Sequence, residues 1–113
     1  MVTVELFLTE DGFIRAFQVD GHAGAAPYGE DIVCASISVL SQTAVVGLNY
    51  FLSQAPEVRI EEGLLRCTLP EKLNPREKEQ AQVILKTMEL GLKALEPNYG
   101  KYFKLHNRRW TKC

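Results

Sequence analysis

The sequence lacks the features that would assign it to several large classes of protein. Its 113 residues carry 13 Lys and Arg against 14 Asp and Glu, so no excess of charge directs it to nucleic acid or to a membrane surface. No apolar run approaches the roughly 20 residues that span a bilayer, and we therefore expect no membrane partner. The first residues also lack a basic region ahead of an apolar stretch, so we expect no signal peptide.

Cysteine is scarce, and its spacing argues against a framework of disulfides. The three cysteines, Cys34, Cys67 and Cys113, are odd in number and far apart, which favours a reducing, cytoplasmic location. Internal repeats and low-complexity tracts are absent as well. The composition, 46% hydrophobic and 24% charged, is typical of a folded globular chain, and the length predicts a single domain over residues 1–113.

Alternating apolar residues and turn signals predict two β-hairpins. Residues 2–8 and 13–20 are expected to pair around a turn at Asp11-Gly12. In the returning strand the odd-numbered residues share the predicted inner face, and Arg15 is the one polar member of that face. A second hairpin is predicted over residues 57–69, with its turn at the Glu-Glu-Gly sequence.

Two helices separate the predicted strands. The first, over about residues 31–52, is apolar on most of its circumference and is expected to be central and buried. The second begins at a cap on Asn74, where Glu77 completes a capping box, carries one apolar stripe, and is expected to stop at Pro97. With a last strand at 101–106, the order β-β-α-β-β-α-β predicts an α+β fold with a largely antiparallel sheet, one buried helix and one amphipathic helix.

Residues 21–34 form the segment in which chemistry is expected. A long glycine-rich loop joins strand to helix, and such loops often carry function. With Asp31 as the N-cap, Cys34 lies in the first helical turn, where free N–H groups and the helix dipole favour a thiolate while the charge of Asp31 opposes it. His22, at the other end of the loop, could accept the thiol proton. The alternatives are a buried structural cysteine and an ordinary surface histidine.

Three further interpretations concern the surroundings of this loop. Ser38 follows Cys34 by one helical turn and could bond the thiol or a substrate, although a bond back to its own helix is the commoner role. A phosphate cradle is disfavoured because Glu30 and Asp31 lie where the anion would bind and because no GxxxxGK[ST] motif exists. A zinc site would have too few ligands, so we predict neither a metal nor a cofactor.

The C-terminal segment, residues 101–113, is basic and contains no acidic residue. Its aromatic residues are interleaved with the cations, an arrangement that could contact RNA. A solvated basic strand and tail is the favoured interpretation. The cations are Lys101, Lys104, Arg108, Arg109 and Lys112.

The motif around the loop resembles that of a known family. Gly21-His22-Ala23, then Gly29, then Asp31-Ile32-Val33-Cys34-Ala35 with Ser38 following, are similar to the bacterial ribosomal-processing cysteine protease family, Prp. The chain length, the Asp11-Gly12 hairpin and the predicted order of elements agree with the resemblance, which covers essentially the whole chain.

The resemblance implies roles for individual residues. Cys34 would be the nucleophile and His22 the general base of a thiol protease, and helix-start N–H groups could stabilise the oxyanion. Asp31 could orient His22 or serve only as the cap. The loop would close over bound substrate, with Tyr28 as a substrate contact or a loop anchor. The residues assigned to this substrate loop are Gly21, Gly24, Tyr28 and Gly29.

The resemblance also implies a substrate and an assembly. The known task of the family is to remove a short N-terminal extension from a large-subunit ribosomal protein, the bacterial protein numbered twenty-seven, and its members look like homodimers. Two alternatives stay open. One is a non-catalytic ribosome- or RNA-associated binding module that uses the basic C-terminal segment, and the other is a structural α+β dimer in which Cys34 is merely buried.

Overall fold

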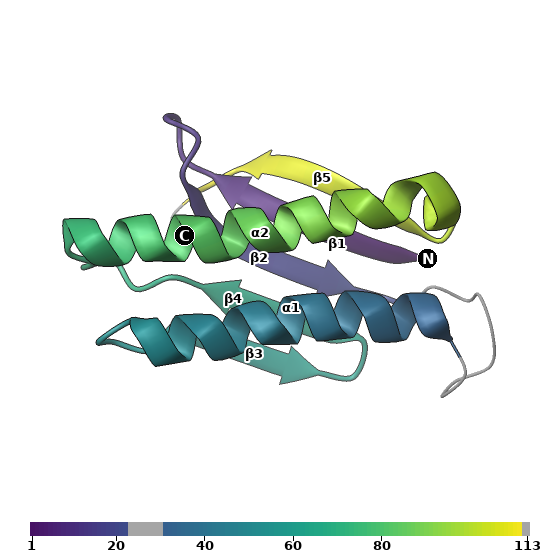
Figure 1. The fold of residues 1–113 in the computed structure, drawn as a ribbon, viewed down its shortest axis with the longest axis horizontal. Coiled ribbons are helices and arrows are strands. Elements are labelled where there is room, and N and C mark those ends of the chain that lie inside the picture. Colours follow the sequence, from purple (N-terminus) through teal and green to yellow (C-terminus); the bar gives the residue numbers. More distant parts are fainter. Residues whose placement is uncertain (23–30, 112–113) are drawn as a thin grey trace.

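Two helices lie side by side over one face of a five-stranded sheet (Figure 1). The structure is a computed structural model, and it describes residues 1–22 and 31–111. The elements are β1 (Val2–Leu8), β2 (Ile14–Asp20), α1 (Ile32–Phe51), β3 (Glu57–Glu61), β4 (Leu64–Thr68), α2 (Pro75–Tyr99) and β5 (Phe103–Arg109). This order confirms the predicted α+β fold.

The strands follow the spatial order β3-β4-β2-β1-β5. Neighbouring strands are antiparallel except for β1 and β5, which run parallel, so the sheet is largely antiparallel as predicted. A parallel pair needs a long crossover, and α2 carries the chain from β4 to the opposite edge of the sheet. The last strand begins two residues later than predicted and extends to Arg109.

A β-bulge changes the inner face predicted for β2. The pairing with β1 shifts after Phe7 and leaves Arg15 as an extra residue. The core position therefore goes to Ile14, which is 3% exposed. The guanidinium carbon of Arg15 lies 5.1 Å from the centre of the Trp110 ring instead. The predicted inward position of Arg15 is wrong because the bulge interrupts the alternation of side chains.

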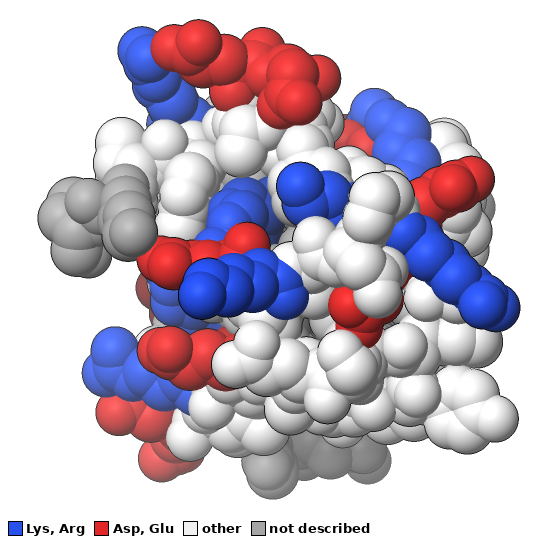
Figure 2. Space-filling model, turned by 90° about the vertical axis from the view of Figure 1, so that its left-hand side faces the viewer, with Lys and Arg blue, Asp and Glu red and all other residues white. Residues whose placement is uncertain are grey.

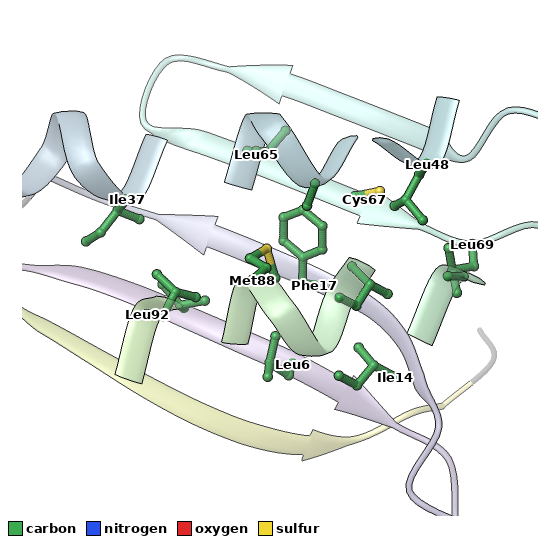
Figure 3. Close-up of a cluster of buried hydrophobic side chains, with 14 of the residues drawn as sticks. Leu6, Ile14, Phe17, Ile37, Leu48, Leu65, Cys67, Leu69, Met88 and Leu92 are labelled. Atoms are coloured by element: carbon green, nitrogen blue, oxygen red, sulfur yellow. The ribbon is translucent and has the colours of Figure 1, made fainter. Parts of the chain in front are cut away.

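The core lies between the sheet and the helices. Figure 3 shows Leu6 and Phe17 from the sheet beside Leu48 of α1 and Leu92 of α2. All four side chains are fully buried. Burying a side chain of this size contributes about 1.5–3 kcal/mol to the free energy of unfolding. The packing of these side chains therefore holds both helices on the sheet.

The helix α1 has the predicted ends, but it is not buried on all sides. Asp31 is its N-cap and Leu52 its C-cap. The side facing the sheet is buried, whereas Val39, Val46 and Tyr50 on the other side are 65%, 66% and 81% exposed. The prediction of a centrally buried helix is wrong in this respect, because a fold of two layers covers only one side of each helix.

By length and composition, α1 could also cross a membrane. It has 20 residues and contains no Lys, Arg, Asp or Glu, contrary to the expectation drawn from apolar runs. Core helices of globular proteins meet the same criteria. In this fold one side of α1 packs into the core described above.

The helix α2 has the predicted start and a later end. Asn74 Oδ1 accepts from the Glu77 N–H at 2.8 Å and the Glu77 carboxylate accepts from the Asn74 N–H at 3.3 Å, which confirms the capping box. The predicted stop at Pro97 is wrong, since the helix continues to Tyr99. Proline removes one hydrogen bond, and in the last turn few bonds follow that could be disrupted.

Candidate active site

Three ends of elements meet on one side of the molecule: the end of β2, the start of α1 and the turn between β3 and β4. In Figure 1 they lie at the right-hand end. The Gly21 N–H donates to the Gly63 carbonyl at 2.8 Å, a bond that ties the end of β2 to this turn. The same turn therefore fixes the backbone that carries His22.

Glycine is required at both ends of that hydrogen bond. Gly21 has a φ of +94°, and a Cβ there would lie 2.5 Å from the Met1 carbonyl oxygen. Gly63 has a φ of +71°, and a Cβ there would lie 3.4 Å from His22 Nε2. The imidazole of His22 thus lies against the backbone of Gly63, which limits how far the ring can move in that direction.

The Asp31 cap holds Cys34 in the first turn of α1. The Asp31 Oδ1 atom accepts from the N–H groups of Val33 and Cys34, each at 3.0 Å, and the Asp31 side chain is buried. The Ala35 N–H donates to the Asp31 carbonyl at 3.0 Å. The predicted cap is confirmed. In this structure these three N–H groups, among those suggested for an oxyanion, donate to Asp31.

One cavity of about 580 Å³ brings most of the predicted residues together. His22, Asp31, Cys34 and Ser38 all line it, and the volume is ordinary for a ligand site. No Lys or Arg is among the described residues that line it, whereas Asp31 and Glu61 are. A thiol and an imidazole on one cavity can perform nucleophilic chemistry on a bound carbonyl compound.

The hydroxyl of Ser38 behaves differently from those of the neighbouring serines. Ser36 and Ser41 bond back to carbonyls of their own helix at 2.7 and 2.8 Å. Within the described part of the chain no such bond is found for the Ser38 hydroxyl, and the side chain is exposed beside the cavity. The hydrogen bond from Ser38 back to its own helix, the commoner role of such a serine, is therefore not observed.

Cys67 does not line this cavity. Cys67, on β4, is 1% exposed, and burial raises the pKa of its thiol to about 12. Cys113 lies outside the described residues, as do Gly24, Tyr28 and Gly29 of the predicted substrate loop. Among residues 1–22 and 31–111, no group of three or more His, Cys, Asp or Glu side chains could hold a metal ion.

Part of the basic C-terminal segment forms the edge strand β5, which has acidic neighbours. Arg108 pairs with Glu5 and Arg109 with Glu10, each at 2.8 Å. Figure 2 shows the end of the molecule away from the cavity, where acidic and basic side chains lie close together rather than in patches of one sign. Exposed pairs stabilise little, but they offset the charge that RNA would contact.

Sequence reasoning missed the contribution of distant elements to the cavity. Val2, Gln42, Ile60 and Gly63 all line it or shape it, and they come from β1, α1, β3 and the β3–β4 turn. The Glu-Glu-Gly sequence signals only a hairpin turn. Nothing in that pattern indicates that the turn lies against His22, because the pairing of β2 with β4 is a tertiary contact.

Comparisons with known proteins agree with this fold and site. A family model described as cysteine protease Prp matches residues 1–104. The fold and the match define the class of the protein: it is a cysteine protease, and hence a hydrolase. The chain belongs to the Prp family of these enzymes. Its enzymatic class leaves no support for the non-catalytic alternatives.

Two relatives illustrate the breadth of the match. The ribosomal processing cysteine protease Prp of Staphylococcus aureus strain Mu50 is 31% identical over 111 residues, covering 94% of this chain and 98% of the relative. That of Bacillus subtilis strain 168 is 29% identical over 101 residues, covering 88% and 90%.

Two crystal structures of the S. aureus protease have the same fold as this chain. The complex with a covalently linked product peptide has a TM-score of 0.85 at 28% identity, and the match covers 96% of this chain and 100% of the other. The complex with a substrate peptide has a TM-score of 0.80 at 26% identity, with the same coverage.

Proposed function

We propose that this protease uses Cys34 and His22 as a catalytic dyad to remove the N-terminal extension of a ribosomal protein precursor. The single observation that carries the proposal is that both side chains line one cavity, although they come from the end of β2 and the start of α1. The substrate is the large-subunit protein numbered twenty-seven. The names of the relatives, which are ribosomal processing proteases, support this substrate class.

The proposed reaction proceeds through an acyl-enzyme. His22 accepts the thiol proton, and the Cys34 sulfur attacks the carbonyl carbon of the scissile bond. The tetrahedral adduct collapses as the leaving amine takes the proton from His22. His22 then activates a water molecule, which attacks the thioester, and Cys34 leaves as the thiolate or thiol.

Asp31 and Ser38 have supporting roles in this proposal. Because the Asp31 carboxylate accepts from the Cys34 N–H, it positions the nucleophile through the helix cap. The exposed Ser38 hydroxyl is placed to bond the substrate. The oxyanion needs donors other than the N–H groups that Asp31 occupies. Gly24, Tyr28 and Gly29 are assigned to substrate binding on the resemblance alone.

The proposal includes the assembly and location of the enzyme. Residues 1–113 act as one domain, and two copies form a homodimer in the cytoplasm. The exposed apolar residues Val39, Val46 and Tyr50 on α1 support an interface between copies. Cys34 and Cys67 are thiols rather than members of a disulfide, which supports a reducing compartment. Sedimentation equilibrium tests the dimer directly.

The experiment uses a peptide that spans the extension junction, with every protein in a Cys113→Ser background. Cleavage is expected for the parent, and none above background for Cys34→Ala or His22→Ala. Val83→Thr, an exposed change on α2 away from the cavity, serves as the control and should cleave like the parent. Cleavage that persists in folded Cys34→Ala would refute the dyad, and failure of the parent to cleave would refute the substrate.

A further inference from the structure

Ile60 occupies an unusual position on the sheet. It pairs with Leu65 on the neighbouring antiparallel strand, and directly paired residues point to the same face. Leu65 is 9% exposed on the face that the helices cover, and Val58, two residues before Ile60, packs against the core. Ile60 is nevertheless 73% exposed. The inner face of the sheet is therefore left uncovered at Ile60, which lines the catalytic cavity.

The opposite wall of the cavity continues away from the nucleophile along α1. Cys34, Ser38 and Gln42 follow one another at intervals of four residues, so they share one side of the helix. All three line the cavity, and Ser38 and Gln42 are exposed. The rise from Cys34 to Gln42 is roughly 12 Å, at about 1.5 Å per residue. That length accommodates about three to four residues of an extended chain.

We propose that Ile60, Ser38 and Gln42 form a subsite that binds the substrate polypeptide in extended form. An apolar side chain of the substrate covers Ile60, and main-chain amides bond the hydroxyl of Ser38 and the carboxamide of Gln42. We assign the substrate as the occupant because Ile60, Ser38 and Gln42 line the same cavity as Cys34. The inference rests on the proposed function, since it takes Cys34 as the attacking residue.

The first test is Ile60→Thr in the Cys113→Ser background. Threonine keeps the β-branched shape that suits a strand and removes the apolar surface. With the junction peptide, we expect KM to rise about fivefold to tenfold and kcat to stay the same, because apolar contacts of this size contribute to binding. Val83→Thr, a change of the same kind on α2 at a residue 62% exposed and outside the cavity, should leave both constants unchanged.

The second test identifies the partner of Ile60 on the peptide. Each apolar residue of the junction peptide is replaced in turn by serine, and each peptide is assayed with the parent and with Ile60→Thr. One replacement should raise KM in the parent and have no further effect in the variant, the non-additivity that contacting residues show. The rate of Cys34 alkylation by iodoacetamide should be the same in both proteins, because the small reagent does not occupy the subsite.

The outcomes separate this inference from the proposed function. If the parent cleaves the peptide and Ile60→Thr has the same KM, the subsite is refuted and the dyad stands. If the parent does not cleave the peptide, the proposed substrate fails and the subsite fails with it. If Ile60→Thr changes the oligomeric state in sedimentation and leaves KM unchanged, a second copy covers Ile60 and the inference is wrong.

Discussion

The first turns of the two helices use the same cap for different purposes. Asp31 and Asn74 each accept an N–H from the third residue of the helix that follows. In α2 that residue is Glu77, whose carboxylate returns a hydrogen bond to the cap and is buried. In α1 it is Cys34, which lines a cavity.

The difference lies in what the third residue contacts. Glu77 also accepts from the N–H and the hydroxyl of Ser53, at 2.7 and 2.8 Å, and so joins the start of α2 to the chain just after α1. All of its bonds stabilise the fold. Cys34 is held equally well through its backbone, while its side chain lines the cavity where the proposed reaction takes place. The same kind of cap thus supports a structural contact at Glu77 and holds the proposed nucleophile at Cys34.

The largest effect is expected from Cys34→Ser, which exchanges only the reactive atom. Cleavage should fall by a factor of about a thousand or more, because the hydroxyl is a far poorer nucleophile near neutral pH. The free energy of unfolding should change by no more than about 0.5 kcal/mol, since the side chain is partly exposed and serine is nearly the same size. Peptide cleavage and thermal denaturation measure the two effects. A large loss of stability would mean that Cys34 is structural after all.

The second prediction contrasts Cys34 with the thiol in the core. With a pKa of about 12, only about one Cys67 thiol in ten thousand is ionised at pH 8. Iodoacetamide should therefore modify Cys34 first and leave Cys67 unmodified in the folded Cys113→Ser protein. Mass spectrometry of the digested product identifies the site. Because the pKa of Cys67 is raised, its contribution to stability should persist below about pH 9 and be lost as the pH rises toward 12.

The third prediction removes each cap in turn. Asp31→Ala and Asn74→Ala should each lower the free energy of unfolding by about 1 kcal/mol. Only Asp31→Ala should also lower kcat, by roughly tenfold, because the displaced first turn carries the proposed nucleophile, Cys34. Denaturant titration and peptide cleavage measure the two quantities. Equal activity in both variants would show that the cap does not position Cys34.

The smallest effect is expected from Glu77→Gln. It concerns stability, and it should depend on pH. Hydrogen bonds from the Ser53 backbone N–H and hydroxyl, and from the Asn74 N–H, hold the pKa of Glu77 below its usual value. A lowered pKa means that its contribution to stability is present above about pH 4.5 and is lost as the pH falls through the native value. The parent should therefore be the more stable protein near neutral pH, and the gap should close in acid. Melting curves from pH 7 down to pH 3 measure this.

The site was predictable where local sequence determines local structure. The cap at Asp31 and the place of Cys34 in the first turn follow from the chain itself, and so does the position of His22 at the end of a strand. The close approach of Gly63 to His22 was not predictable, because it depends on β4 pairing with β2 rather than on any nearby residue. The exposure of Ile60 was not predictable either, because it depends on how the helices cover the sheet.

The sequence by itself determined the order of the elements, both helix starts and both hairpins, since turns, caps and periodicity act over a few residues. Only the tertiary structure decided that Ile14 replaces Arg15 in the core and that one side of α1 stays exposed. These outcomes depend on which layers meet and how the strands align. Both outcomes result from contacts between residues far apart in the chain, and a local sequence pattern does not indicate such contacts.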